Sequence, residues 1–359
     1  MPLREELVQL TKDLVAIPSV SDDAAGRTAV IDFITRYCQN LPGVQLVRHE
    51  SNGFPSLVVA FDDQPAKALV LNAHVDVVPG RSEQFEPFER DGRIYGRGTQ
   101  DMKGAAAAML VLLKTLAEQG ERPNVAWQFV TDEEIGGEDG VAHLLRQGYT
   151  ADFFIAGEPT DLRIVNRAKG ILWINVQQSG NPAHGSRPWD GDNPLVPIAD
   201  GLRKLLERYP IPATEIWRTT VTPSALHSGD AHNRVPVDAL LKLDIRRVPD
   251  ESADDILRFV QECFPAAHID ASHCGSALET QPEDQHVSKL AQAIEAVTND
   301  RVQFYGEHFG SDARFYSEVG VPAVCFGPVG AGLHSHEEWV DIGSLEIFYQ
   351  VLQQLVQQY

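Results

Sequence analysis

The sequence predicts an α/β fold in which a main domain is built from both ends of the chain and a smaller α+β domain is inserted between them. Strand-like apolar runs alternate with helix-like stretches in the first half, and the same alternation returns near the C-terminus. Between these two regions the sequence pattern changes to longer strand-like runs and to loops that contain glycine and proline. We therefore expect one domain from 1–173 and 281–359, and an inserted domain from 174–280.

The first part of the chain alternates between helix and strand patterns. Apolar spacing over 7–15 is typical of an amphipathic helix, and the apolar run 125–130 is typical of a buried strand. On these grounds the expected elements are, in order, helix 7–15, strands 57–60 and 68–71, helix 102–116, strand 125–130, a helix starting over 140–145 and strand 153–156. Most of the polar candidate residues discussed below come directly after a strand.

The same patterns predict the elements of the inserted domain and of the C-terminal part of the chain. In the insertion we expect strand 171–176, a loop containing Gly180, Pro182 and Gly185, helix 194–207, and strands near 219 and over 240–244. The C-terminal part is expected to contain helix 286–297, strand 322–326 and helix 345–356.

Composition limits the classes of partner. The 359 residues carry a formal net charge of −21 and are 43% hydrophobic, which is ordinary for a globular protein of more than one domain. Binding to nucleic acid or to an anionic membrane needs clustered Lys and Arg, so neither partner is expected. A small molecule or another protein is the expected partner.

The N-terminus and the cysteines indicate a cytoplasmic protein. Acidic residues occupy the segment 1–7, where a signal peptide would be basic and then apolar, and no apolar run is long enough to span a bilayer. The four cysteines are scattered without a CxxC pair, so neither a disulfide framework nor a cysteine metal site is expected.

Polar residues with metal-ligand chemistry follow several of the predicted strands. His74 and Asp76 come after strand 68–71, where the imidazole could bind a metal and the carboxylate could orient the ring. Asp101 stands in a glycine-rich turn before helix 102–116. Taken alone, His74 with Asp76 could be a surface feature, and Asp101 could be a helix N-cap.

Further candidate ligands follow the later strands. Three adjacent acids at 132–134 would repel one another unless a cation compensated them, which favours a metal site. Glu158, and His334 with His336, complete a set of hard and borderline ligands. From the residues alone, either Glu133 or Glu134 could be the ligand, and so could either histidine.

Together these segments resemble the family of co-catalytic zinc peptidases that includes acetylornithine deacetylase, succinyl-diaminopimelate desuccinylase and glutamate carboxypeptidase. The motifs are Asn72-Ala73-His74-Val75-Asp76-Val77-Val78-Pro79, Gly96-Arg97-Gly98 with Asp101-Met102-Lys103-Gly104, Asp132-Glu133-Glu134, Gly157-Glu158-Pro159-Thr160 and Leu333-His334-Ser335. The resemblance implies a zinc-peptidase-like catalytic domain with a mixed central sheet flanked by helices. It also implies that 174–280 is a ferredoxin-like lid and dimerisation domain.

The resemblance assigns a role to each ligand position. It implies that His74 and Glu158 bind one metal ion, that Glu134 and His334 bind the other, and that Asp101 bridges both. It implies further that Asp76 orients His74 and that Glu133 is the general base. The expected cofactors are two divalent ions, with zinc favoured and cobalt or manganese as alternatives. In the family motif the second histidine is His334, so His336 is expected only to line the mouth of the site.

The inserted domain contributes the expected substrate contacts. By the resemblance, Asn233 and Arg246 contact a substrate carboxylate, which an Arg fork can bind with two hydrogen bonds. His184 is implied to reach the active site of the other subunit of a homodimer and to bind the oxyanion. Ser311, in the catalytic domain, is a further expected substrate contact, because its loop resembles the family's Gly-Thr-Ser-Asp segment, although Phe309 and Gly310 depart from that pattern. Arg246 could instead form a surface ion pair.

The expected activity is hydrolysis of the amide bond of a small N-acyl amino acid, of the deacetylase or desuccinylase type. A dipeptidase or carboxypeptidase acting on short peptides is the alternative, because the chemistry is the same and only the pocket differs. Two other classes are weaker: a metal-free binding protein of the same fold, and a dinucleotide-binding enzyme suggested by the glycines at 327–332. Every ligand position is filled, which argues against the metal-free protein.

Overall fold

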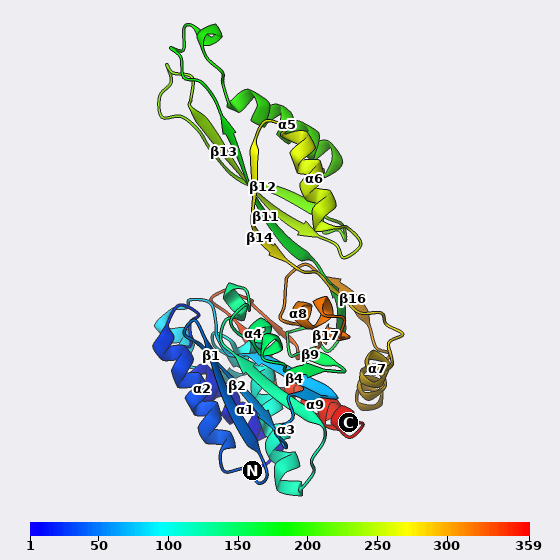
Figure 1. Ribbon diagram of the computed structural model, residues 1–359. Coiled ribbons are helices and arrows are strands. Elements are labelled where there is room, and N and C mark those ends of the chain that lie inside the picture. The colour runs from blue at the N-terminus through cyan, green and yellow to red at the C-terminus, as the bar shows by residue number, and fades with distance from the viewer. The chain divides into compact units, whose positions relative to one another are not determined.

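The computed structural model describes residues 1–359 and contains two compact units (Figure 1). Unit 1 comprises Met1–Asn166, Glu279–Tyr305 and Ser311–Tyr359, and unit 2 comprises Arg167–Leu278 and Gly306–Gly310. Unit 1 is thus assembled from both ends of the chain, whereas unit 2 is mostly one continuous insertion. The short segment Gly306–Gly310, which was expected in the main domain, packs with unit 2.

A mixed sheet of nine strands forms the centre of the main fold. The strand order is β1 (Gln45–Ser51), β2 (Phe54–Ala60), β7 (Val125–Val130), β4 (Leu69–His74), β9 (Phe154–Ala156), β17 (Ala323–Cys325), β10 (Ile164–Ala168) and β15 (Leu278–Glu279), with β16 (Phe304–Glu307) paired to β10. Strands β7, β4, β9 and β17 are parallel, and the outer pairings β1–β2, β2–β7 and β17–β10 are antiparallel. The expected mixed sheet is confirmed.

Helices cover the sheet. Those that pack on one another are α1 (Leu3–Val15), α3 (Gly104–Gln119), α7 (Gln285–Thr298) and α9 (Ile342–Val356), while α2 (Ala24–Cys38) packs against β2. Ile155 of β9 joins the apolar core that these helices form. The next residue back, Phe154, stacks on Tyr316 of α8 (Ala313–Glu318), with ring centroids 4.1 Å apart. Because successive strand residues point to opposite faces, α8 covers the other face of the sheet, where it contacts α4 (Val141–Arg146).

Smaller strands and helical turns surround the main sheet. A four-stranded antiparallel sheet has the order β18 (Gly330–Ala331), β19 (Trp339–Asp341), β6 (Arg93–Tyr95) and β5 (Phe88–Arg90). Strands β3 (Ala66–Lys67) and β8 (Thr150–Ala151) form a separate parallel pair. Helical turns are η1 (Ser82–Phe85), η2 (Thr99–Lys103) and η3 (Glu133–Ile135). The small sheet therefore joins the chain just before Asp101 to the chain around His334.

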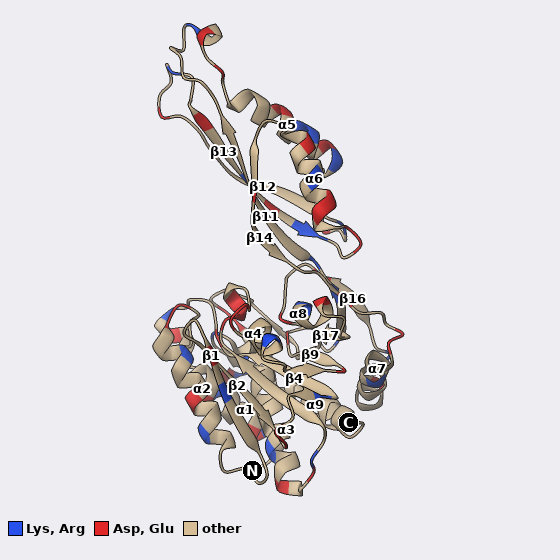
Figure 2. Ribbon diagram, in the orientation of Figure 1, with Lys and Arg blue, Asp and Glu red and all other residues tan.

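Unit 2 has the ferredoxin-like order that the resemblance implied. Its elements are β11 (Gly170–Ser179), η4 (Pro188–Asp190), α5 (Leu195–Arg208), β12 (Thr220–His227), β13 (Asp238–Arg247), α6 (Ala253–Cys263) and β14 (His268–Gly275). The strands form an antiparallel sheet in the order β12-β13-β11-β14. Alternate residues Leu172, Ile174 and Val176 are buried in the same core as Ile198 of α5 and Ile256 of α6. Both signs of charge appear along α5 and α6 (Figure 2).

Two helices that the periodicity analysis did not predict begin at clear capping residues. Asp23 caps α2 by accepting the backbone N–H of Ala25, and Ser252 caps α6 in the same way with Asp254. In α6 the buried residues Ile256, Val260 and Cys263 repeat at helical spacing. None of the helices is both long enough and apolar enough to cross a membrane.

Candidate metal centre

The candidate ligands meet because three neighbouring parallel strands end at the same edge of the sheet. In the register of these strands His74 of β4 lies opposite Val130 of β7, and Asn72 lies opposite Ala156 of β9. The acidic turn 132–134 therefore begins beside His74, and Glu158 follows the next strand on the other side. Ligand sites in open α/β sheets form at this carboxyl edge.

The first donor group consists of His74, Asp101 and Glu158. One ligand atom from each lies within 4.8 Å of the other two. His74 Nε2 is 2.9 Å from Asp101 Oδ1, and its ring is completely buried, as is almost all of Glu158. A nitrogen and two carboxylates held this close fit a divalent cation of the zinc type.

The second donor group consists of Asp101, Glu134 and His334, again with one atom of each within 4.8 Å of the others. His334 Nε2 lies 3.4 Å from Asp101 Oδ2 and 3.2 Å from Glu134 Oε2. The two oxygens of Asp101 thus face different histidines, as a bridging carboxylate must. The sequence left Glu133 and Glu134 as alternatives, and in the structure Glu134 joins a donor group while Glu133 joins neither.

His334 and His336 have different surroundings. His334 is in the second donor group, although its side chain remains about half exposed at 54%. His336 is exposed and belongs to neither group. The geometry therefore favours His334 as the ligand, which is the position that the family motif selects.

Asp76 connects His74 to the acidic turn. The backbone carbonyl of Asp76 is 3.1 Å from His74 Nδ1, and its carboxylate is 3.5 Å from the same nitrogen. That carboxylate also accepts the backbone N–H groups of Glu133 and Glu134, each at 3.3 Å, and the hydroxyl of Ser21 at 2.8 Å. One buried carboxylate therefore orients the imidazole and positions the two glutamates.

The electrostatics of the centre are those of a crowded carboxylate cluster. Burial, and then the neighbouring Glu158 carboxylate, raise the pKa of Glu133 well above its usual value, and burial does the same to the pKa of Glu158. Hydrogen bonds to Asp101 and Glu134 raise the pKa of His334 to about 10. Two divalent cations would relieve this repulsion and satisfy the histidine nitrogens, so the donor set fits a two-metal centre.

His74 and Asp101, which both belong to the first donor group, shift each other's pKa values. Burial alone would lower the pKa of His74, but hydrogen bonds to Asp101 and Asp76 outweigh burial and raise it well above its usual value. Burial would raise the pKa of Asp101, but hydrogen bonds from His334 and His74 lower it. Asp101 is therefore a carboxylate, the form that can bridge two cations.

The residues expected to bind substrate lie mostly in unit 2. His184 and Asn233, which are far apart in sequence, are brought together because His184 pairs with Arg234 in an antiparallel bridge and the Gly185 N–H donates to the Asn233 carbonyl at 2.6 Å. Both side chains belong to exposed residues. Arg246 forms an ion pair with Asp244 on the same strand, with Nε 3.0 Å from Oδ1.

Ser311 is enclosed in unit 1. It is only 1% exposed, and its hydroxyl lies 3.0 Å from the sulfur of Cys325. The hydroxyl is thus directed into the interior, and a contact with substrate would require this loop to rearrange.

Several residues that structure this edge were not singled out from the sequence. Arg97 and Glu338 form a buried ion pair beside Asp101, and Lys103 is buried with its ammonium bonded to the carbonyls of Leu14 and Ile17. Burial lowers the pKa of Lys103 to about 7. Arg97 and Lys103 belong to motifs that were noted for Asp101, and Glu338 follows the His334 motif, but no sequence pattern shows which of these side chains will pair.

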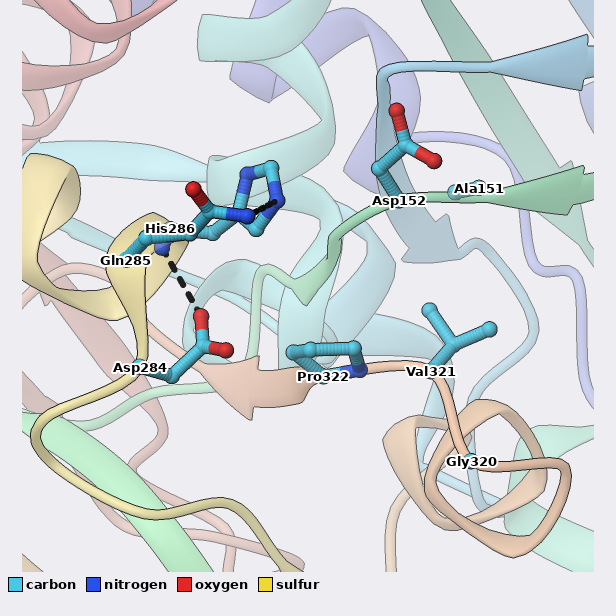
Figure 3. A pocket seen from close by; sticks show the side chains of 8 residues that line it. All are labelled: Ala151, Asp152, Asp284, Gln285, His286, Gly320, Val321 and Pro322. Atoms are coloured by element: carbon cyan, nitrogen blue, oxygen red, sulfur yellow. Dashed lines mark hydrogen bonds between the residues drawn. The ribbon is translucent and has the colours of Figure 1, made fainter.

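A separate pocket lies at the opposite edge of the sheet. Its volume is about 510 Å³, and it is lined in part by Asp152, Asp284, His286 and Pro322 (Figure 3). Asp152 and Pro322 precede β9 and β17, whereas the donor residues follow their strands. This pocket is therefore not part of the candidate metal centre.

Comparison with known sequences places the chain in a family. The family model described as peptidase family M20/M25/M40 matches residues 70–358. A probable carboxypeptidase of Emericella nidulans is 33% identical over 287 residues, which are 70% of this chain and 66%, just under two thirds, of that relative. A succinyl-diaminopimelate desuccinylase of Xanthomonas campestris pv. campestris is 29% identical and covers 99% of each chain.

Comparison with solved structures agrees on the fold. Aminopeptidase PepT from Bacillus cereus superposes with a TM-score of 0.83 at 20% identity, covering 99% of this chain and 98% of that one. A dinuclear metal binding peptidase of family M20 from Bacillus subtilis gives a TM-score of 0.70 at 14% identity, covering 98% and 97%. Together with the match over residues 70–358, these findings confirm the resemblance: the chain belongs to peptidase family M20/M25/M40 and is a metallohydrolase that acts on amides or peptides.

Proposed function

We propose that this enzyme hydrolyses the amide bond of a small N-acyl amino acid, of the deacetylase or desuccinylase type, at a centre of two divalent metal ions, with zinc as the native metal. The observation that carries this proposal is the pair of three-residue donor groups that share Asp101. The full-length relative named as a succinyl-diaminopimelate desuccinylase supports the acyl amino acid class.

The metal roles follow the two donor groups. His74 and Glu158 would hold one ion, Glu134 and His334 the other, and Asp101 would bridge them. When bound, the two ions would activate the attacking water and stabilise the negative charge that develops on the amide oxygen.

Glu133 is proposed as the general base. It is next to a ligand in sequence, its backbone is fixed by Asp76, and its carboxylate belongs to neither donor group. A carboxylate with a raised pKa can accept a proton from water and return it to the leaving nitrogen. Asp76 holds His74 and Glu133 in place during this exchange.

His184 is proposed to bind the oxyanion from the other subunit of a homodimer. His184 Nδ1 lies 2.8 Å from the Ser186 hydroxyl and 3.2 Å from the backbone nitrogen of Ser186, which fits the neutral tautomer that carries its N–H on Nε2. Because His184 is exposed, that N–H can be donated to a group outside its own loop. A donor placed where negative charge develops contributes roughly 10²- to 10³-fold to the rate.

A cationic pocket in unit 2 supports recognition of a free carboxylate. Arg246, Lys169 and His308 line a pocket of about 220 Å³ together with one acid, Glu215, whose carboxylate is 3.2 Å from His308 Nε2. Lys169 is almost fully buried, and its ammonium reaches the Ile216 carbonyl only at 3.5 Å. Burial, and then the nearby Arg218 and Arg246, lower the pKa of Lys169, while Glu215 acts in the opposite direction. A substrate carboxylate would compensate this charge, and Asn233 is proposed as a further contact.

The alternative is a dipeptidase or carboxypeptidase, and the Emericella nidulans relative, named as a probable carboxypeptidase, favours the second of these. The two activities are distinguished by assaying a panel of substrates with zinc, cobalt or manganese bound. The panel consists of acetylornithine, succinyl-diaminopimelate, acetyl-methionine and simple dipeptides. Preference for an acyl amino acid supports the proposal, and preference for dipeptides supports the alternative. A cytoplasmic location and a homodimeric state are part of the proposal, and sedimentation of the purified protein tests the second.

A further inference from the structure

A buried ion pair lies directly beside the proposed metal centre. Arg97 NH1 is 2.5 Å from Glu338 Oε2, and the two side chains are 3% and 1% exposed. Removing two charges from water is costly unless each is fully hydrogen-bonded, so the other partners of this pair are informative. Those partners belong to the two loops that present metal ligands.

Glu338 holds the loop that carries Asp101. Its second oxygen, Oε1, accepts the backbone N–H of Gln100 at 3.1 Å and that of Asp101 at 3.2 Å. Hydrogen bonds to a carboxylate are stronger than those between neutral groups. The backbone that presents the bridging ligand is therefore fixed by Glu338.

Arg97 holds the turn that carries His334. Its second terminal nitrogen donates to the backbone carbonyl of Ser335 at 3.1 Å, and Gln84 donates to the same carbonyl at 3.0 Å. His334 itself has a φ of +57°, in the left-handed region that residues with side chains rarely adopt. Such a conformation persists only where surrounding contacts enforce it, and Arg97 and Gln84 supply two of them.

We propose that the Arg97–Glu338 pair is a positioning device that sets the metal affinity of the second donor group, by holding the Asp101 loop and the His334 turn at a fixed separation. This inference rests on the proposed two-metal centre. The first donor group depends less on the Arg97–Glu338 pair, because His74 stands at the end of β4 and is oriented by Asp76. Loss of the Arg97 contact to Ser335 should therefore weaken one site selectively.

The sharpest variant is Arg97→Lys. Lysine keeps a positive charge beside Glu338, but it lacks the guanidinium fork that reaches Glu338 and the Ser335 carbonyl together. Glu338→Gln is the complementary variant, because its amide oxygen can still accept the two backbone N–H groups while the negative charge is lost. Asp62→Asn is the matched control: Asp62 pairs with the buried Lys67 of β3, and neither residue belongs to a donor group.

The measurement is a calorimetric titration of metal-free protein with cobalt(II), which gives a dissociation constant for each site. His334→Ala identifies which of the two constants belongs to the second group. For Arg97→Lys and Glu338→Gln we expect the second constant to rise about 10- to 100-fold, the range typical of lost outer contacts to metal ligands. Both dissociation constants are measured on the same protein, so their ratio reports selective weakening of one site. A general loss of stability would not change this ratio, and the melting temperature measures such a loss separately.

The outcomes separate the inference from the proposal on which it rests. Selective weakening of the second site in both variants, with both constants unchanged in Asp62→Asn, supports the positioning role. Equal weakening of both sites, no weakening, or the same change in Asp62→Asn overturns it. If the wild-type protein binds no cobalt, the proposed function fails as well; if it binds two ions and Arg97→Lys behaves like wild type, only the positioning role fails.

Discussion

Replacing Glu133 by glutamine should remove the general base without removing the metal ions. The substitution preserves the size of the side chain, and the backbone N–H of Glu133 can keep its 3.3 Å hydrogen bond to Asp76. Because Glu133 is in neither donor group, both sets of ligands stay complete. A positioned base contributes roughly 10²- to 10⁴-fold to the rate, which corresponds to about 3–5 kcal/mol of activation free energy.

The assay compares kcat and metal content in the same preparation. Glu133→Gln should lower kcat by that factor and leave KM and the metal content close to wild type. Glu138→Gln is the control, because Glu138 lies in the same loop, is exposed and pairs only loosely with Arg146 at 3.6 Å. Loss of metal from Glu133→Gln, or a kcat close to that of the control, would refute the assignment of Glu133 as base.

Three further outcomes are expected. Asp101→Asn should lose most of both metal ions together with activity, since Asp101 is shared by the two donor groups, and metal analysis of the purified variant checks this. In metal-free protein the raised pKa of His334, about 10, means that its contribution to stability is complete below its ordinary pKa of 6.5 and is lost as the pH rises through about 10. Thermal melts between pH 6.5 and 10 should therefore show a smaller decline for His334→Ala than for wild type, and an equal decline would contradict the pairing of His334 with the carboxylates. Mixing inactive His184→Ala with inactive Glu133→Ala under conditions of subunit exchange should restore part of the activity, whereas no recovery after proven exchange would exclude action of His184 across subunits.

Much of the fold could be predicted because hydrophobic patterning is local. Buried strands such as β7 and β4 are nearly continuous apolar runs, and helices α7 and α9 follow the expected periodicity. Helix α2 was missed because its buried positions include Gly26 and Arg27, which dilute the apolar pattern. The segment Gly306–Gly310 was assigned to the main domain because its packing against Trp217 is a long-range contact that no local pattern reveals.

The candidate site was predictable to a different extent. The residue types after β4, β7 and β9 indicate metal chemistry, and the parallel strands explain why they meet. The choice between Glu133 and Glu134 depends on the path of one short turn, which is fixed by Asp76, a residue far away in sequence that follows the neighbouring strand β4. The pairing of Arg97 with Glu338 and the enclosure of Ser311 depend on tertiary packing, so the sequence alone could not show them.

The central claim is that two divalent ions occupy this centre on either side of Asp101. Anomalous X-ray scattering at the zinc edge, from crystals of protein purified without chelator, tests it most directly. We expect two peaks about 3.5–4 Å apart, one among His74, Asp101 and Glu158 and the other among Asp101, Glu134 and His334. No peak at these residues, a single peak, or a second peak coordinated by His336 instead of His334 would contradict the account.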